Sequence, residues 1–203
     1  MKTLTINNHE SKRSLLDYAF NALGCFDLHM CCSSNAGENY PSFSRWVSYE
    51  TLMHLEDSQV IPHSWPRMSK RRFLECVAHR TVLDIEVVFD VDDVYYGKGA
   101  YDSLEETPRF SSIKAKSEWI VKELKSHGAK DVVVHESGGK GYHISILLPL
   151  LRGMEPWVRE EFKRELLLAY GADPATAGRK HMISMEGSFH RKTGRLKQEI
   201  EVK

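Results

Sequence analysis

The residues best suited to chemistry are acidic side chains at the end of an apolar segment, residues 81–93. Val87 and Val88 are typical of a β-strand, and Asp90 and Asp92 follow at alternate positions. Alternate residues of a strand share a face, so these two carboxylates point the same way. Paired carboxylates among apolar residues are unfavourable unless a cation lies between them. Mg²⁺ and Mn²⁺ prefer such oxygen ligands, which usually act together with substrate phosphates.

The same segment has a second interpretation, in which the strand runs into an acidic surface turn. Asp92 and Asp93 followed by a tyrosine and Gly97 are also typical turn residues. Residues 95–110 are predicted to form a polar loop beside the carboxylates. That loop is either a mobile substrate-binding element or a surface insertion.

A glycine-rich turn is the second candidate for chemistry. Residues 136–149 read E-S-G-G-K-G-Y-H-I-S-I-L-L-P, and a strand is predicted on each side of the glycines. Glycines let backbone N–H groups approach an anion, and Lys140 adds positive charge. A strand rather than a helix follows, so the turn is not a Walker loop. His143 is predicted to donate to a phosphate, although a lone histidine is more often a hydrogen-bonded structural residue.

A third polar segment lies near the C-terminus, in residues 181–195. Ser188, His190 and Lys192 alternate after Gly187 and would share one face of an extended chain. Their hydroxyl, imidazole and ammonium groups are suitable donors for a triphosphate or a nucleic-acid backbone.

The chain has 203 residues, and its 28 basic and 28 acidic side chains give a formal net charge of zero. This balance gives no general sign of nucleic-acid binding and leaves that function to local basic patches. No apolar run is long enough to span a bilayer, and the N-terminus becomes polar too early for a secretory signal. We therefore predict a cytoplasmic protein without a membrane partner.

The four cysteines also fit a reducing cytoplasm, because none of them form a C-x-x-C pair and their spacing suggests no disulfide framework. A zinc site that combines some of them with a nearby histidine is an alternative, although their spacing matches no common structural zinc pattern. The cysteines are Cys25, Cys31, Cys32 and Cys76.

Alternating strands and helices must position these candidate residues. Apolar spacing predicts helices over residues 11–23, 46–55, 111–127 and 157–170. Strands are predicted over residues 26–32, 81–93, 131–135, 142–148 and 198–203. The apolar stripe of the last helix is formed by Val158, Phe162, Leu166 and Tyr170. A strand, helix and strand in succession form a crossover, which predicts a partly parallel or mixed sheet.

We therefore predict an α+β fold with a mixed β-sheet core and flanking helices. The chain is predicted to form one domain, with an N-terminal part over residues 1–80 and a motif-bearing part over residues 81–203.

Three segments in order resemble a known family: V-V-F-D-V-D, then E-S-G-G-K-G-Y-H-I-S-I, then M-I-S-M-E-G-S-F-H-R-K-T-G. They resemble the small catalytic subunit of archaeal and eukaryotic DNA primases, within the archaeo-eukaryotic primase-polymerase superfamily. That family carries D-x-D at a strand end, S-G-x-x-G-x-H, and R-L-P-G-S-L-H-x-K-T-G. The resemblance covers residues 87–194. It implies a minimal version of the primase catalytic core, which is RRM-like.

The resemblance also implies roles for individual residues. Asp90 and Asp92 would be catalytic and would bind Mg²⁺ or Mn²⁺. The implied reaction is attack of a 3′-hydroxyl on the α-phosphate of a nucleoside triphosphate, on a single-stranded DNA template. A larger accessory primase subunit is an implied partner. The implied nucleotide-binding residues are Ser137, Gly138, Lys140, Gly141, His143, Ser188, His190 and Lys192.

One departure from the family pattern concerns the metal site. The family's third acidic ligand aligns with Gly178, which has no carboxylate, and Ser184 and Glu186 replace an arginine and a proline. The alternatives for the third carboxylate are Asp173, Glu186, Glu199 and Glu201.

Three functional hypotheses follow from these residues. The first is a primase-type nucleotidyltransferase, favoured by the retention of paired carboxylates. The second is a catalytically inactive primase-like subunit that binds nucleotide or nucleic acid, favoured by Gly178. The third is a metal-dependent phosphodiesterase, which would act without nucleoside triphosphates.

Overall fold

The structure is a computed structural model, and it describes residues 28–32, 47–62, 67–96, 109–178, 181–190 and 192–202. The helix predicted over residues 11–23 and most of the predicted loop over residues 95–110 lie outside these ranges. The chain divides into two compact units. The first comprises residues 1–83 and 182–197, and the second comprises residues 84–181 and 198–203. Both contain helices and strands, which confirms the α+β prediction.

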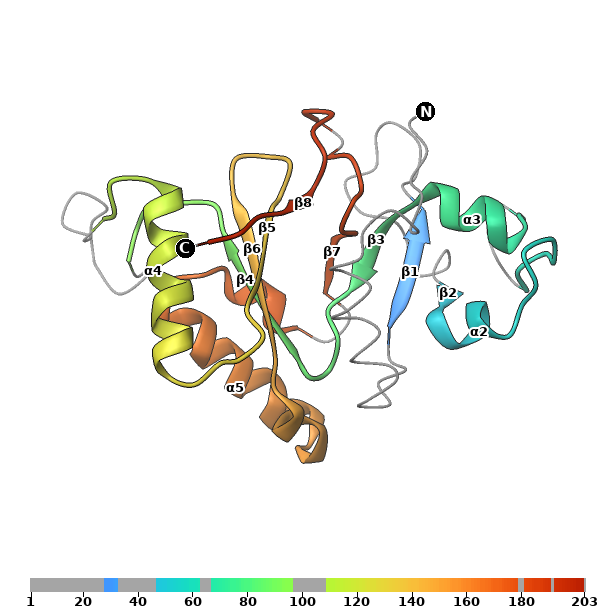
Figure 1. Cartoon of the computed structure of the whole chain (residues 1–203). Coiled ribbons are helices and arrows are strands. Elements are labelled where there is room, and N and C mark those ends of the chain that lie inside the picture. The colour runs from blue at the N-terminus through green and yellow to red at the C-terminus, as the bar shows by residue number, and fades with distance from the viewer. Residues whose placement is uncertain are drawn as a thin grey trace. The chain divides into compact units, whose positions relative to one another are not determined.

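The first unit contains a four-stranded antiparallel sheet (Figure 1). In spatial order its strands are β2 (Val47–Ser48), β1 (His29–Cys32), β3 (Val77–Thr81) and β7 (Met182–Ser184). Its helices are α2 (Tyr49–Met53) and α3 (Lys70–Cys76). Ser48 and Ser69 cap these helices, because each hydroxyl accepts a hydrogen bond from a backbone N–H of the first turn.

The second unit contains another four-stranded sheet and the two longer helices (Figure 1). In spatial order its strands are β4 (Glu86–Val91), β6 (Tyr142–Leu147), β5 (Val133–Glu136) and β8 (Gln198–Glu199). Its helices are α4 (Ile113–Ser126), α5 (Pro156–Ala169) and the short 3₁₀ helices η4 (Pro149–Gly153) and η5 (Pro174–Ala177). No helix in the described ranges is long and apolar enough to cross a membrane.

The prediction of a mixed sheet is wrong, because every ladder between the described strands is antiparallel. β4 and β5 do run in the same direction, as the crossover through α4 predicts. They are not neighbours, however, because the turn at residues 137–141 folds β6 back along β5 and places it between them. β6 therefore pairs antiparallel with both strands.

The prediction of a single strand over residues 81–93 is also wrong. β3 ends at Thr81, a connection follows, and β4 begins at Glu86. Val82, Leu83 and Ile85 in this connection are as buried as strand residues. Because these residues are apolar, the sequence shows no break between the two strands. The connection nevertheless contains the boundary between the two units, which lies after Leu83.

α5 buries a different face from the one its apolar spacing predicts. Its buried side chains are Arg159, Lys163 and Leu167, whereas Phe162 is 40% exposed. Arg159 is buried because its guanidinium Nη2 lies 2.9 Å from Asp84 Oδ2, while its aliphatic stem packs inside. An ion pair to a distant residue therefore overrides the apolar stripe.

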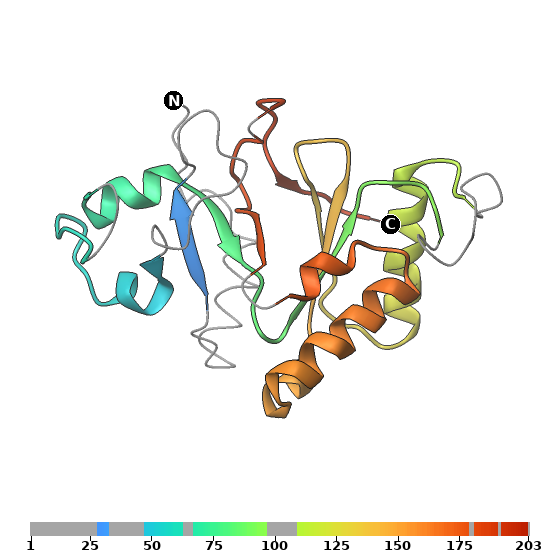
Figure 2. The same ribbon diagram turned by 180° about the vertical axis from the view of Figure 1, so that it is seen from behind.

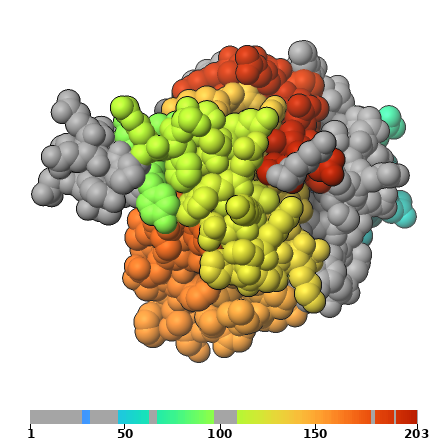
Figure 3. Space-filling model, turned by 60° about the vertical axis from the view of Figure 1, so that its left-hand side comes forward, coloured from blue at the N-terminus to red at the C-terminus, as the bar shows by residue number. Residues whose placement is uncertain are grey.

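α4 and α5 cover one face of the second sheet (Figures 1 and 2). Phe89 on β4 makes an edge-to-face contact with Tyr170 at the end of α5, with ring centroids 5.4 Å apart. Trp119 on α4 contacts the same tyrosine at 5.6 Å, and the surfaces of the two helices adjoin in the space-filling view (Figure 3). Because side chains alternate along β4, Asp90 lies on the opposite face of the sheet from Phe89.

Candidate functional site

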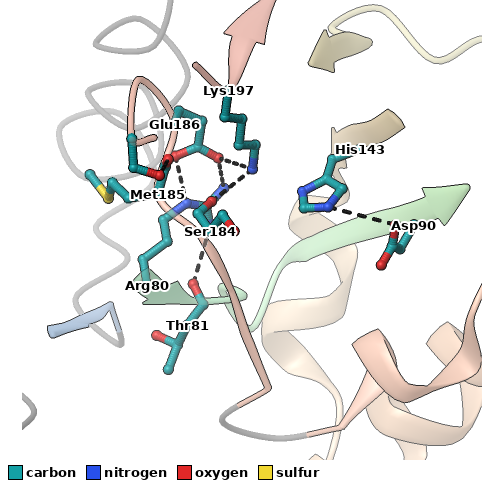
Figure 4. A network of polar contacts seen from close by, with 9 residues as sticks. Arg80, Thr81, Asp90, His143, Ser184, Met185, Glu186 and Lys197 are labelled. Atoms are coloured by element: carbon teal, nitrogen blue, oxygen red, sulfur yellow. Dashed lines mark hydrogen bonds and ion pairs between the residues drawn. The ribbon is translucent and has the colours of Figure 1, made fainter. Parts of the chain in front are cut away.

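Asp90 at the end of β4 and His143 at the start of β6 lie next to each other in the second sheet. Asp90 and His143 are direct cross-strand partners, and Asp90 Oδ1 lies 3.6 Å from His143 Nε2 (Figure 4). The carboxylate is one-third exposed, at 34%, whereas the imidazole is only 9% exposed. The distance is that of an ion-pair contact rather than of a short hydrogen bond. The carboxylate therefore faces both an imidazole and solvent.

Gly141 allows the glycine-rich turn to lie against the acidic end of β4. A Cβ on this residue would lie 2.5 Å from the carbonyl oxygen of Val91 and 3.2 Å from Cα of Asp92. No side chain fits at such distances from backbone atoms, so only glycine permits this approach. The turn is closed by the Ser137 N–H, which donates to the Gly141 carbonyl at 3.0 Å.

The rest of the turn combines a constrained backbone with one exposed cation. Gly138 has a φ of 76°, a left-handed conformation that favours glycine. The Ser137 hydroxyl accepts a hydrogen bond from the Gly139 N–H at 3.2 Å, which fixes the local backbone. Lys140 is exposed at the tip. The turn therefore places a cation and a constrained backbone beside Asp92.

The three carboxylates at the end of β4 have different environments. Asp93 Oδ1 lies 2.9 Å from Lys116 Nζ and accepts a hydrogen bond from the Tyr95 N–H at 3.0 Å. The buried Lys116 also donates to the Gly171 carbonyl at 2.7 Å, so this pair ties α4 to two loops. Asp92, in contrast, is exposed. Asp93 is thus used within the fold, whereas Asp92 is exposed and Asp90 is one-third exposed beside His143.

The donor chemistry of Asp90 and Asp92 fits Mg²⁺ or Mn²⁺. Both ions take oxygen ligands, and Mg²⁺ is typically held by one or two carboxylates together with water and substrate phosphates. Within the described ranges, no group of three or more His, Cys, Asp or Glu side chains is arranged to hold a metal ion. The two carboxylates therefore fit an ion that arrives with phosphate ligands rather than one held by protein alone.

The four alternatives for a third carboxylate differ in position. Glu186 is buried and bonded to two cations, Glu199 lies on β8 opposite His135, and Glu201 is exposed near the C-terminus. Asp173 is exposed and caps η5 by accepting a hydrogen bond from the Ala175 N–H at 2.9 Å.

Asp173 is the alternative that lies along β4. Its N–H donates to the carbonyl of Asp90 at 3.2 Å. It also affects a nearby imidazole: burial lowers the pKa of His181, and the negative charge of Asp173 opposes that shift. The Asp173 side chain itself is engaged at the start of η5.

The third polar segment forms a hairpin in the first unit. The Gly187 N–H donates to the Lys197 carbonyl at 2.9 Å, and the Lys197 N–H donates to the Ser188 carbonyl at 2.8 Å. The Ser188 hydroxyl is buried and donates to the Met185 carbonyl. The chain turns after His190, so Lys192 does not continue the face of Ser188, as an extended chain would have required.

His190 is held in one tautomer at the tip of this hairpin. Its Nδ1 accepts a hydrogen bond from the Thr193 N–H at 3.3 Å and lies 3.1 Å from the Thr193 hydroxyl oxygen. An Nδ1 that accepts from a backbone N–H carries no proton, so the neutral ring carries its proton on Nε2. His190 therefore offers an Nε2–H donor, and Lys192 nearby is exposed.

The predicted site residues thus fall into two groups. The second unit brings together Asp90, Asp92, Ser137, Gly138, Lys140, Gly141 and His143. The first unit carries Ser188, His190 and Lys192. Their predicted ligands stay predictions.

Sequence reasoning missed His135, although the sequence contains a signal for it. His135 on β5 is buried and is the cross-strand partner of His143. The two histidines are equally distant from Gly139 in the middle of the turn, so a hairpin centred there pairs them. His135 also faces Glu199 on β8. Asp90, His143, His135 and Glu199 therefore form one row across all four strands.

No protein-family model matches the chain, and no curated protein matches it. The likeness to primases is therefore carried by the three sequence motifs alone.

Proposed function

We propose that the chain is a primase-type nucleotidyltransferase. It would start or extend a primer on single-stranded DNA, using nucleoside triphosphates with Mg²⁺ or Mn²⁺. One observation carries this proposal: a cross-strand Asp90–His143 pair lies beside a glycine turn that packs directly against Asp92. Carboxylates suit the metal and the turn suits phosphates, so both halves of a metal–triphosphate have partners in one region.

The topology of the second unit supports a primase-like core. Its elements follow the order β4, α4, β5, β6, α5, and β6 lies between β4 and β5. This is the split β-α-β arrangement of ferredoxin-like and RRM-like folds, although β8 pairs with β5, whereas those folds place their last strand beside the first. The free edge of β4 is covered by the η5 segment, because the Thr176 hydroxyl donates to the Val88 carbonyl at 2.7 Å.

The residues have separate roles in this proposal. Asp90 and Asp92 would hold the metal ions, which when bound stabilise the attacking and leaving oxygens of the transferred phosphate. Lys140 would bind the triphosphate through its exposed ammonium group, since the Ser137 and Gly139 N–H groups already donate within the turn. His143 Nε2, which lies 3.6 Å from Asp90 Oδ1, would share its one proton between that carboxylate and a phosphate oxygen. In the first unit, His190 would donate from Nε2–H to a phosphate of the DNA template.

A specific observation favours a second candidate function, an inactive primase-like subunit that binds nucleotide or DNA. Gly178 stands where the resemblance implies a third carboxylate, and it lies after η5 with no side chain to offer. The described residues contain no cluster of three or more metal-ligating side chains either. Binding without incorporation would distinguish this candidate.

The experiment is incorporation of labelled nucleoside triphosphates on single-stranded DNA, with and without a primer. The double variant Asp90→Asn, Asp92→Asn should lose at least about 10²-fold in rate, because several kcal/mol of charge stabilisation is removed. Asp131→Asn, which changes an exposed carboxylate beside β5, is the matched control and should keep the wild-type rate. A double variant with full activity would disprove the metal assignment. Nucleotide binding without incorporation by the wild-type protein would favour the inactive subunit.

A further inference from the structure

The first unit contains a buried ion-pair network that the proposed function does not use (Figure 4). Arg80 donates from Nε to Glu186 Oε2 at 2.8 Å and from Nη2 to Oε1 at 2.7 Å. Lys197 Nζ lies 3.4 Å from Glu186 Oε1 and donates to the Ser184 carbonyl at 2.8 Å. Arg80, Glu186 and Lys197 are only 1%, 4% and 1% exposed. These three residues are called the clasp below.

The clasp joins three segments through one carboxylate. Arg80 belongs to β3, Glu186 precedes the hairpin, and Lys197 ends its returning arm. Both cations contact Glu186, and Arg80 is further fixed by donating from Nη1 to the Thr81 carbonyl at 3.1 Å. Removing the Glu186 carboxylate would therefore take away the anion that Arg80 and Lys197 share, while the Met185 N–H would still donate to the Ala78 carbonyl of β3 at 2.7 Å.

The clasp lies at the base of the hairpin whose tip carries His190. From the base, the Gly187 N–H donates to the Lys197 carbonyl at 2.9 Å, and the His190 N–H donates to the Arg195 carbonyl at 2.7 Å. The turn beyond them supplies the Thr193 N–H that selects the His190 tautomer. A change in the separation of the two arms at the base would thus alter the turn that orients the imidazole.

We propose that Glu186 is a positioning residue, whose clasp holds the hairpin so that His190 presents its Nε2–H donor. This inference rests on the proposed function only in naming the ligand of His190 as a phosphate.

The physical reason is that a buried network of ion pairs fixes the positions of its residues but adds little to the free energy of unfolding. The loss of hydration largely offsets the attraction between buried charges, and well-packed apolar residues often stabilise as much. A bidentate arginine–carboxylate pair, however, fixes direction as well as distance.

The test is the ¹⁵N NMR spectrum of the His190 ring at pH 8, in the full chain. The wild-type ring should show a protonated Nε2 and an unprotonated Nδ1 with widely separated shifts. In Glu186→Gln the two shifts should move toward each other, because the ring exchanges between tautomers. Asp84→Asn, which breaks the Arg159 pair in the second unit, is the control and should leave the His190 shifts unchanged.

Two further variants keep the test decisive if Glu186→Gln does not fold. Lys197→Met leaves Arg80 and Glu186 buried as an ion pair whose charges balance. It should still loosen the returning arm of the hairpin and therefore change the His190 shifts in part. The triple variant Arg80→Met, Glu186→Leu, Lys197→Met replaces the clasp by apolar side chains. Wild-type His190 shifts in a folded triple variant would show that the clasp only stabilises, and would overturn the proposal.

Steady-state kinetics separate this inference from the proposed function. A positioning role predicts that Glu186→Gln raises the KM for the single-stranded DNA template about tenfold with little change in kcat, because the ground-state contact between His190 and a template phosphate is weakened. If the wild-type protein incorporates no nucleotide but the His190 shifts respond to Glu186→Gln, the proposed function fails and the positioning role stands. Unchanged shifts in every folded clasp variant would refute the positioning role whatever the activity.

Discussion

Gly141→Ala is the change that tests the geometry of the candidate site most sharply. The added Cβ would lie 2.5 Å from the Val91 carbonyl oxygen, against about 3.4 Å for an ordinary contact. Both partners are backbone atoms of paired strands, so neither can rotate away. The start of β6 and the end of β4 must therefore separate by about 0.9 Å.

Two magnitudes follow from this separation. Overpacking of this kind typically lowers the free energy of unfolding by about 1–3 kcal/mol. For a chain of about this size, each kcal/mol shifts Tm by about 2–4 °C, so Tm should fall by roughly 2–12 °C. A displacement near 1 Å between Asp92 and the turn proposed to bind phosphate can reduce a reaction rate by about 10²-fold. The loss of kcat/KM should thus exceed what partial unfolding explains.

The assay combines thermal unfolding with nucleotide incorporation at a temperature well below both values of Tm. Gly153→Ala is the matched control, because a Cβ on Gly153 meets no atom within 4 Å. It should change the free energy of unfolding by no more than about 0.5 kcal/mol and leave kcat/KM unaltered. A Gly141→Ala protein with wild-type Tm and wild-type kcat/KM would refute the close approach of the turn to Asp92.

Three further changes test individual residues. His143→Ala should raise the KM for nucleoside triphosphate about tenfold, and unchanged steady-state kinetics would remove His143 from the site. Lys116→Met leaves Asp93 without its buried cation, so the free energy of unfolding should fall by about 1–3 kcal/mol and the urea midpoint should fall with it. An unchanged urea midpoint would contradict this. Because the pKa of His181 is lowered in the folded state, protons bind the unfolded chain more readily, and stability should decline as pH falls below 6.5. His181→Gln should flatten that part of the urea-midpoint profile.

The local elements of the second unit were predictable because their signals are local. The helix predicted over residues 111–127 forms as α4 over Ile113–Ser126, where the Ser112 hydroxyl accepts from the Ala115 N–H. The turn between β5 and β6 follows from its glycines, whereas the adjacency of Asp92 to Gly141 depends on the pairing of β4 with β6, which the crossover pattern did not predict. Each of these features depends on residues close in the chain or on one strand pairing.

The features that sequence reasoning missed depend on distant partners. Glu186 was one of four alternatives for a metal ligand, yet its carboxylate is bound by Arg80, 106 positions away. The inward face of α5 differs from its apolar stripe because Asp84 draws Arg159 inside. β4 and β5 were predicted to adjoin, but a hairpin inserts β6 between them. Apolar periodicity shows which face of one helix or strand is apolar, but it does not show which charged residue far away in the chain that element will contact.

The most direct test of the central claim is template-directed incorporation on four homopolymer single-stranded DNAs, each offered all four labelled nucleoside triphosphates in turn. The proposed function predicts that each template directs incorporation of its complementary nucleotide, and that the Asp90→Asn, Asp92→Asn variant abolishes every product. Incorporation that ignores the template, or none on any template with a folded wild-type protein, would contradict it.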